Sequence, residues 1–193
     1  MIKTGIFGGS FNPIHNGHIN LVRELLRKEN LMDEVFLMVS PLNPFKEKDP
    51  DLLDDTFRLQ LARKAVAHEP HISVSDYEFR LPRPTYTWNT LRHLTTDYPD
   101  RQFLLIIGSD NWLSFPRWAH HEELLARYPI IIYPRKGYPV DASSLPPSVR
   151  LVETPLYPVS STLIRERVRH HEDISQLVPE NIVEDVERLY RNA

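Results

Sequence analysis

Short runs of apolar residues alternate with amphipathic segments along the whole chain. The run Ile2 to Phe7 is followed, from about Gly17, by apolar residues that fall on one face of a helix, which predicts a βα unit. Further strand-like runs lie at Glu34 to Val39, Ile72 to Ser75, Phe103 to Ile107 and Ile130 to Tyr133. The helical patterns between and after them are Phe57 to Ala67, Thr87 to Leu94, Glu122 to Arg127, Ser161 to Val168 and Ile182 to Tyr190.

The runs Phe103 to Ile107 and Ile130 to Tyr133 are apolar without interruption, as expected where both faces of a sheet are covered by helices. We therefore expect the α/β class: a Rossmann-like, doubly wound, mostly parallel sheet with helices on both faces. At 193 residues the chain should form one domain, 1–193. Proline gathers at Pro41 to Pro50, Leu81 to Pro84 and Pro134 to Pro158, which we expect to be loops. In such sheets ligands bind at the carboxyl ends of the strands, so motifs that follow strands matter most.

The composition restricts the partners of the protein. Apolar residues make up 41% and charged residues 25%, as in ordinary globular proteins, and the net charge of −3 gives no general attraction to nucleic acid or to an anionic membrane. The absence of cysteine excludes disulfides and thiolate chemistry. No apolar run is long enough for a signal peptide or a membrane span, so we expect a cytoplasmic protein. Oligomeric state cannot be read from the sequence, and a homo-oligomer stays open.

The segment Gly8 to His18 directly follows the first predicted strand and leads into the first helix. Paired glycines allow a close backbone approach, a helix N-terminus offers free N–H groups to an anion, and His15 and His18 add hydrogen bonds. Together these features predict phosphate binding. Either histidine or the glycine pair alone would more often be structural. A metal site on the two histidines is a weaker alternative, because no nearby carboxylate cluster completes a ligand set.

Several ordered motifs resemble those of the HxGH nucleotidyltransferases, specifically the nicotinate (or nicotinamide) mononucleotide adenylyltransferases of NAD synthesis. The first motif contains His15-Asn16-Gly17-His18, which is the HxGH signature itself. The likeness covers nearly the whole chain, and its motifs are Gly8 to His18, Ser40 to Lys46, Arg83 to Thr87 with Thr90-Leu91, Ile107 to Asp110, Phe115 to Trp118 and Val159 to Arg165.

The resemblance implies that the 5′-phosphate of nicotinate mononucleotide attacks the α-phosphate of ATP and releases pyrophosphate, with Mg²⁺ accompanying ATP. It implies catalytic roles for His15, His18, Lys46 and Arg165. The residues that would bind ATP are Gly8, Gly9, Ser10, Phe11, His18, Gly108, Asp110, Ser160, Ser161, Thr162 and Arg165. Those that would bind the mononucleotide are Asn12, Lys46, Thr85, Tyr86, Thr87 and Trp118. Such a reaction needs two polyanions aligned and developing charge neutralised.

Taken without the resemblance, several of these residues have plainer interpretations. Ser160 to Thr162 suit the capped start of a structural helix, and Asp110 could cap the helix after its strand. A lone Trp such as Trp118 is more often part of a core, and Lys46 would be an ordinary loop lysine. Phe45 stands where histidine is common in bacterial members. Ser10 and Asn12 likewise replace the threonine and aspartate of many bacterial enzymes.

Three alternatives stay open at this point. Nicotinamide mononucleotide could be the preferred acceptor, since sequence does not fix the surroundings of a bound carboxylate. Another HxGH enzyme, such as phosphopantetheine adenylyltransferase or a cytidylyltransferase, is less favoured because Thr85 to Thr87 and Trp118 suit a pyridine ring. A nucleotide-binding sensor without catalysis is the third, and retention of His15, His18, Lys46 and Arg165 argues against it. An aminoacyl-tRNA synthetase fragment is disfavoured by the lack of a KMSKS-type lysine signature and of a basic excess.

Overall fold

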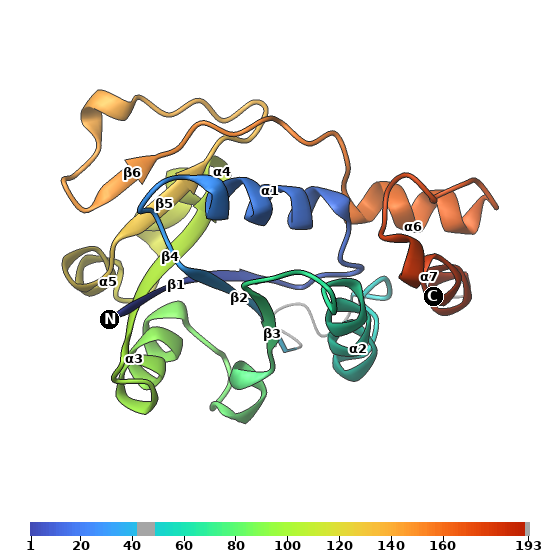
Figure 1. Ribbon diagram of the computed structural model, residues 1–193, viewed down its shortest axis with the longest axis horizontal. Coiled ribbons are helices and arrows are strands. Elements are labelled where there is room, and N and C mark those ends of the chain that lie inside the picture. Colours follow the sequence, from blue (N-terminus) through green and yellow to red (C-terminus); the bar gives the residue numbers. More distant parts are fainter. Residues whose placement is uncertain (42–48, 192–193) are drawn as a thin grey trace.

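A computed structural model describes residues 1–41 and 49–191. Six parallel strands form one sheet in the order β3-β2-β1-β4-β5-β6 (Figure 1). The strands are β1 (Ile2–Gly9), β2 (Glu34–Val39), β3 (Ile72–Ser75), β4 (Arg101–Gly108), β5 (Ile130–Tyr133) and β6 (Val149–Leu151). The order reverses between β1 and β4, and this reversal is the doubly wound, Rossmann-like arrangement that the sequence pattern predicts.

The helices divide between the two faces of the sheet, as Figure 1 shows for α1 and α3. They are α1 (Asn16–Arg27), α2 (Asp55–Ala65), α3 (Thr87–Asp97), α4 (Ser109–Ser114), α5 (His121–Arg127), α6 (Ser161–Arg169) and α7 (Val183–Tyr190). One core cluster joins the sheet to α1, α2, α6 and α7, and the other joins it to α3 and α5. None of the helices in the part of the chain described is long and apolar enough to cross a membrane.

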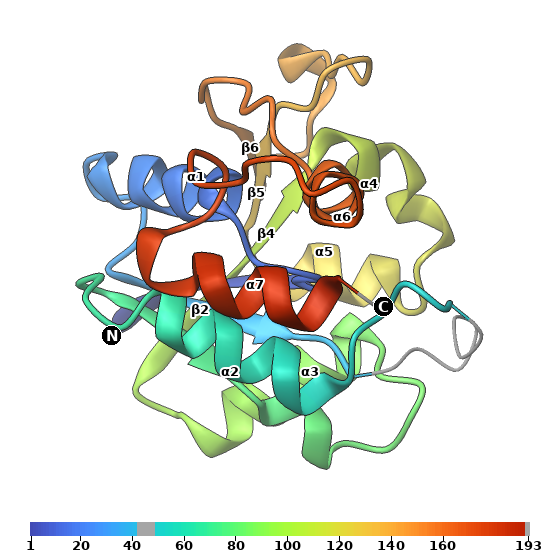
Figure 2. The same cartoon turned by 90° about the vertical axis from the view of Figure 1, so that its right-hand side faces the viewer.

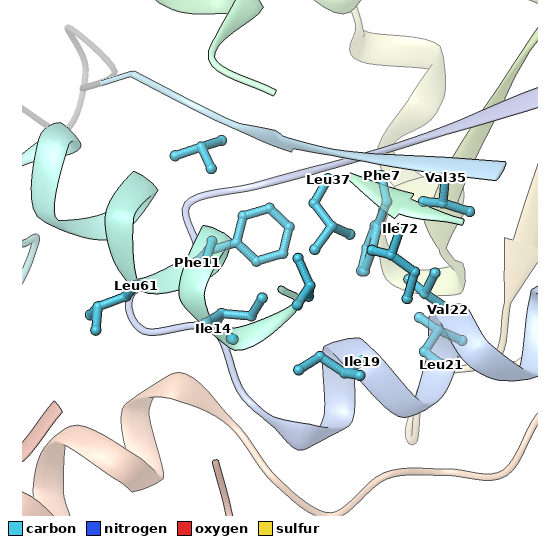
Figure 3. Close-up of a cluster of buried hydrophobic side chains, with 14 of the residues drawn as sticks. Phe7, Phe11, Ile14, Ile19, Leu21, Val22, Val35, Leu37, Leu61 and Ile72 are labelled. Carbon is cyan, nitrogen blue, oxygen red and sulfur yellow. The ribbon is translucent and has the colours of Figure 1, made fainter. Parts of the chain in front are cut away.

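Alternation along the strands explains the two cores. Phe7 faces the α1 cluster while its neighbour Ile6 faces the α3 cluster, as successive residues of a strand must. In Figure 3 Phe7 and Leu37 from the sheet point toward Val22 of α1, and Phe11 from the following loop closes the end of this cluster. Both faces of the central strands are therefore buried, which accounts for their uninterrupted apolar sequence.

The sequence-based elements agree with the structure in type and order, with two omissions. The stretch Pro134 to Pro158, expected to be a loop, contains β6, which adds a short edge strand beside β5. Helix α4 follows β4 directly and was not expected. Both elements are shorter than the window over which a periodic pattern can be recognised.

Helices α6 and α7 lie beside the carboxyl end of β1, at the right of Figure 1 and in front in Figure 2. Their buried residues Ile164, Val168, Val186 and Tyr190 join the same core cluster as α1. The last elements of the chain therefore pack beside the segment that follows the first strand.

Candidate active site

The loop 10–15, between β1 and α1, is held by a buried aromatic ring. Phe11 has a φ of 47°, in the left-handed region that non-glycine residues enter at a cost of about 1 kcal/mol or more. Its side chain is only 2% exposed and packs edge-on against the His18 ring, with centroids 4.9 Å apart. Burial of the ring offsets the backbone cost and fixes the loop next to His18.

A fully buried arginine connects this loop to the segment that follows β2. Nη1 of Arg58, in α2, donates to the carbonyl oxygens of Ser10 at 2.6 Å and of Ser40 at 2.9 Å, and Nε donates to that of Leu53. An ion pair with Asp55 accompanies these bonds. Arg58 thereby holds together the segments that leave β1 and β2.

His15 and His18 form a reciprocal cap at the start of α1. The His18 N–H points to His15 Nδ1 at 3.4 Å, the His15 N–H donates to His18 Nδ1 at 3.1 Å, and the rings stack 3.6 Å apart. Each Nδ1 accepts, so each neutral ring carries its proton on Nε2. The pair can therefore present two Nε2–H donors without being charged.

The surroundings keep both rings neutral. Burial, with the nearby positive charge of Arg135, lowers the pKa of His15 to about 4. Burial also lowers the pKa of His18 well below its ordinary value, and His15 and Arg135 add to this effect. Protonation of either Nδ1 would in addition break the cap. At neutral pH the two side chains of the free protein act as hydrogen-bond donors rather than as cations.

The larger of two cavities opens beside these histidines. It has a volume of about 510 Å³, and its polar lining includes His15, His18, Arg135, Lys136 and Ser160. The rest of the wall is largely apolar and includes Phe7, Leu21, Tyr133, Tyr157 and Val159. A mostly apolar cleft with a polar, cationic corner suits a ligand with a flat ring at one end and an anionic group at the other.

The second cavity lies on the other side of the carboxyl end of β1 and has a volume of about 200 Å³. Three residues predicted to bind the mononucleotide line it, Thr85, Thr87 and Trp118, and so do Gly8 and Gly9, which the resemblance assigns to ATP. The half-buried Trp118 ring packs on Phe115, with centroids 5.3 Å apart. Tyr86 is 43% exposed and does not line the cavity.

An uncapped helix end borders this second cavity. The N-cap residue of α3 is Tyr86, whose side chain accepts no hydrogen bond from the first turn. The first N–H groups of a helix have no partners within the helix, and together with the helix dipole they favour an anion. Thr85 and Thr87 bring this end of the helix to the cavity wall.

The two cavities meet at Phe7 and Tyr133, which line both. Phe7 lies in β1 and Tyr133 ends β5, and β4 lies between these two strands. The strand order reverses between β1 and β4. This is the place where doubly wound sheets bind ligands. Phe7, which lines both cavities, also packs edge-on against the His18 ring, with centroids 6.0 Å apart.

Arg165 and its neighbours reach the loop 10–15 from the far end of the chain. Arg165 Nη1 donates to the Asn12 carbonyl at 2.8 Å, Nη2 to Thr162 Oγ1 at 3.3 Å, and Nε is buried without a partner. Ser161 Oγ donates to the Pro13 carbonyl at 2.8 Å. Ser160 caps α6 by accepting from the Leu163 N–H, so the structural interpretation of this serine is correct.

Asn12 is more deeply engaged in the structure than its predicted role suggests. Its side chain is 4% exposed, donates to the Asp51 carbonyl, and accepts from the Leu53 N–H and the Tyr190 hydroxyl. Neither Asn12 nor Ser10 lines either of these two cavities. The structure therefore shows both residues fixing the loop, while their contact with a substrate stays a prediction.

Gly108 ends β4 and Asp110 lies in the first turn of α4, beside Arg135 and Tyr133. A Cβ at Gly108 would lie 2.5 Å from Asp110 Oδ1, so a larger residue would displace the carboxylate. Asp110 Oδ1 is buried without a hydrogen-bond partner among the described residues, and the N-cap residue of α4 is Gly108, so Asp110 lies inside the helix and does not cap it. The alternative that Asp110 is simply a helix cap is therefore wrong for this structure. A buried acceptor without a donor is suited to a hydroxyl of a ligand.

Lys46 and Phe45 lie outside the residues that the structure describes, so the role predicted for Lys46 stays a prediction. Four other residues were not predicted: Arg135 and Lys136 in the first cavity, Glu78 in the second, and Arg58 beneath the loops. The cationic pair Arg135-Lys136 directly follows β5 and could have been found from that position. Nothing in the local sequence marks Glu78 or Arg58, because only tertiary contacts bury them.

Similar solved structures share the fold over nearly the whole chain. A Plasmodium falciparum nicotinic acid mononucleotide adenylyltransferase complexed with NaAD has a TM-score of 0.78 at 20% identity, covering 98% of both chains. A putative nicotinate-nucleotide adenylyltransferase from Vibrio parahaemolyticus has a TM-score of 0.72 at 24% identity, covering 100% of this chain and 98% of that one. These likenesses show the class of fold, a Rossmann-like, doubly wound α/β sheet.

Sequence comparison narrows this class. Residues 6–167 match the model of the cytidylyltransferase-like family. Probable nicotinate-nucleotide adenylyltransferases of Bacteroides fragilis and Bacteroides thetaiotaomicron are 51% and 44% identical to this chain, over 89% and 100% of it and 85% and 94% of the relatives. The chain belongs to the cytidylyltransferase-like family and, within it, to the nicotinate-nucleotide adenylyltransferases.

Proposed function

We propose that the protein transfers an adenylyl group from ATP to nicotinate mononucleotide, giving nicotinate adenine dinucleotide and pyrophosphate, a step of NAD synthesis in the cytoplasm. The observation that carries this proposal is the pair of cavities meeting at Phe7 and Tyr133, beside the stacked histidines. ATP would occupy the larger cavity and the mononucleotide the smaller. The names of the similar proteins support the same reaction.

The reaction is a single displacement at phosphorus. An oxygen of the mononucleotide 5′-phosphate forms a bond to the α-phosphorus of ATP, and the bond from that phosphorus to the bridging oxygen breaks. Pyrophosphate leaves with the electron pair, so no proton has to move. The protein then needs chiefly to align the reactants and to stabilise charge on the α-phosphate oxygens.

His15 and His18 supply this stabilisation as donors fixed before the substrate arrives. Their Nδ1 atoms are engaged in the cap, so the rings cannot turn freely, and the Nε2–H groups can point at the α-phosphate. Arg135 and Lys136 place positive charge in the same cavity. The unpartnered Nε of Arg165, together with Ser161 and Thr162, supports the predicted contact of this segment with the β- and γ-phosphates. Lys46 remains a proposed phosphate ligand from the sequence.

The smaller cavity provides what a nicotinate ring requires. Trp118 offers an indole face for stacking, and the uncapped N-terminus of α3 offers N–H groups to the ring carboxylate. On the ATP side, the unpartnered Asp110 Oδ1 would accept from a ribose hydroxyl. Binding of nicotinamide instead would leave the α3 N–H groups facing an uncharged amide.

We propose that Mg²⁺ reaches the site bound to the ATP phosphates. The part of the chain that is described contains no group of three or more His, Asp or Glu side chains placed to hold a metal ion. The phosphate oxygens themselves are suitable hard ligands for Mg²⁺, which neutralises charge on the leaving pyrophosphate.

The proposal is tested by measuring pyrophosphate release from Mg-ATP with nicotinate mononucleotide, with nicotinamide mononucleotide and with phosphopantetheine as acceptors. We expect kcat/KM to be highest for nicotinate mononucleotide. A preference for the amide would assign the alternative acceptor. Nucleotide binding without pyrophosphate release would identify a sensor.

His18→Asn is the variant that tests the chemistry. An asparagine oxygen can still accept from the His15 N–H, so the cap is kept while the Nε2–H donor is lost. Loss of such a donor reduces kcat by about 10²–10³-fold. The exposed His170→Asn is the matched control and should keep full activity. Near-normal turnover of His18→Asn would remove His18 from the mechanism.

A further inference from the structure

The smaller cavity contains a buried carboxyl group that the proposed mechanism does not use. Glu78 follows β3 in the 3₁₀ turn Tyr77–Arg80, is 7% exposed, and lines the cavity with Thr85, Thr87 and Trp118. Among the described residues of this lining, the only other ionisable side chain is Tyr133, whose pKa is raised by burial and which is therefore neutral. No cation in the described lining balances a charge on Glu78.

Hydrogen bonding connects Glu78 to the end of α3 that borders the cavity. Thr90 Oγ1 lies 2.6 Å from Glu78 Oε2 and 3.3 Å from the carbonyl oxygen of Tyr86, the N-cap residue of α3. A hydroxyl has a single proton, and neither a carbonyl nor an ionised carboxylate can donate. An ionised Glu78 accepts the Thr90 proton, which Thr90 then shares with the more distant Tyr86 carbonyl, whereas a protonated Glu78 can donate to Thr90 and leave the Thr90 proton to that carbonyl. The protonated state therefore satisfies both contacts more fully.

Burial favours the same protonation state. It raises the pKa of Glu78 to about 7, against the opposing effect of the hydrogen bond from Thr90. The described groups packed around it give no cation to reverse this: Tyr77 on the same turn is bonded to Asp97 of α3, and Arg80 pairs with Asp76 in solvent. Glu78 is therefore poised to be neutral below pH 7 and ionised above it.

An ionised Glu78 and the carboxylate of a bound nicotinate ring would compete for one positive end of α3. Both would be negative, both would lie at a cavity of about 200 Å³, and no described side chain of its wall is cationic. A nicotinamide ring carries no charge and would not be affected in this way.

We propose that Glu78 is a specificity-determining residue of the acceptor cavity, which must be uncharged for nicotinate mononucleotide to bind and which, when ionised, shifts the preference toward an uncharged acceptor ring. This inference rests on the proposed function. In its neutral form Glu78 donates to Thr90, Thr90 donates to the Tyr86 carbonyl, and the first turn of α3 is left free for the ring carboxylate.

The test is the ratio of kcat/KM for nicotinate mononucleotide to that for nicotinamide mononucleotide, measured from pH 6 to pH 9 at saturating Mg-ATP. The two acceptors share the same 5′-phosphate and the same enzyme histidines, so titrations of these groups cancel in the ratio. The ratio should fall about tenfold between pH 6 and pH 8 in the natural protein. In Glu78→Gln, which keeps a donor to Thr90 without an ionisable group, the ratio should not change with pH. The exposed Glu122→Gln is the control and should keep the natural slope.

A second measurement uses only the natural protein. At pH 8, calorimetry in buffers of different ionisation enthalpy should show uptake of close to one more proton per site for nicotinate mononucleotide than for the amide. A ratio that does not vary with pH, a slope that persists in Glu78→Gln, or equal proton uptake for the two acceptors would each overturn the role of Glu78. Absence of adenylyl transfer to either acceptor at every pH would instead overturn the proposed function.

Discussion

The stacked pair His15–His18 combines a structural and a chemical role in the same atoms. Nδ1 of each ring takes part in the cap of α1, and the opposite nitrogen is left as a donor at the larger cavity. A cap made by serine would satisfy the helix but would supply no donor. Burial and the nearby charge of Arg135 lower the pKa of both histidines, so the pair is neutral in the free protein. The positive charge beside the pair belongs to Arg135.

This arrangement predicts a loss of stability in mild acid. The pKa of His15 is about 4 in the folded protein and about 6.5 when unfolded, so the unfolded chain binds the extra proton between these values. The contribution of neutral His15 to the free energy of unfolding is therefore fully present above pH 6.5 and is lost as the pH falls toward 4. Between pH 7 and pH 5 the loss should be about 2 kcal/mol. Urea denaturation at the two pH values measures it.

His15→Asn isolates this effect, because asparagine caps α1 without titrating. The difference in unfolding free energy between the natural protein and the variant should shift by about 2 kcal/mol in favour of the variant between pH 7 and pH 5. His68→Asn, at an exposed site, should show no such shift. If the difference is the same at both pH values, His15 does not titrate abnormally.

At the scale of elements, β1 and α1 each contain a glycine, Gly8 and Gly17, and the two positions differ in the space available for a side chain. A Cβ on Gly17, in the first turn of α1, would lie 2.7 Å from Val159 Cγ1 and 2.8 Å from His15 Cε1. At Gly8, in β1, a Cβ would meet no atom within 4 Å, but it would project at the acceptor cavity. Gly17 is thus required by packing and Gly8 by the space a ligand needs.

The two glycines should respond differently to alanine. Gly17→Ala should lower the free energy of unfolding by about 1–3 kcal/mol and reduce kcat, because the added methyl displaces the His15 ring. Gly8→Ala should stay within about 0.5 kcal/mol of the natural protein and raise the KM for the mononucleotide. Chemical denaturation and steady-state kinetics on both variants check this. Equal loss of stability in the two would contradict the distinction.

At the scale of the whole molecule, the C-terminal helices complete the site that the first strand begins. Arg165 and Ser161 of α6 bond to the Asn12 and Pro13 carbonyls, and Tyr190 of α7 donates to the Asn12 side chain at 2.8 Å. Figure 2 shows α7 in front of the end of the sheet where these contacts lie. The loop 10–15 is therefore held by segments more than 140 residues away in sequence.

Tyr190→Phe tests this long-range support. It removes one buried hydrogen bond while keeping the ring, so we expect a loss of about 1 kcal/mol in stability and a severalfold decrease in kcat. Denaturation and kinetics measured side by side check both. The control is Tyr98→Phe, at the surface near the amino end of β4, which should change neither. A stability loss with unchanged kcat would make Tyr190 a purely structural contact.

Much of this architecture could be predicted from the order of apolar runs. The stretch Phe103 to Ile107 of β4 is apolar without interruption because both faces of the strand are buried there, and α1 has one apolar face because it covers one side of the sheet. The short elements β6 and α4 could not be found in this way. They exist because β5 and β4 provide a paired edge and a packed surface for them.

The features of the candidate site likewise divide into those that the sequence predicts and those that only the tertiary structure reveals. The sequence by itself determined the doubly wound fold and the family, and it predicted Gly8 to His18 as a phosphate-binding segment, because local pattern and ordered motifs carry that information. Only the tertiary structure decided that His15 and His18 are neutral donors, that Asn12 faces inward, and that Glu78 and Arg58 belong to the site. The physical reason is that protonation, burial and hydrogen-bond partners depend on neighbours brought together by folding, and these neighbours leave no mark on the residue's own stretch of sequence.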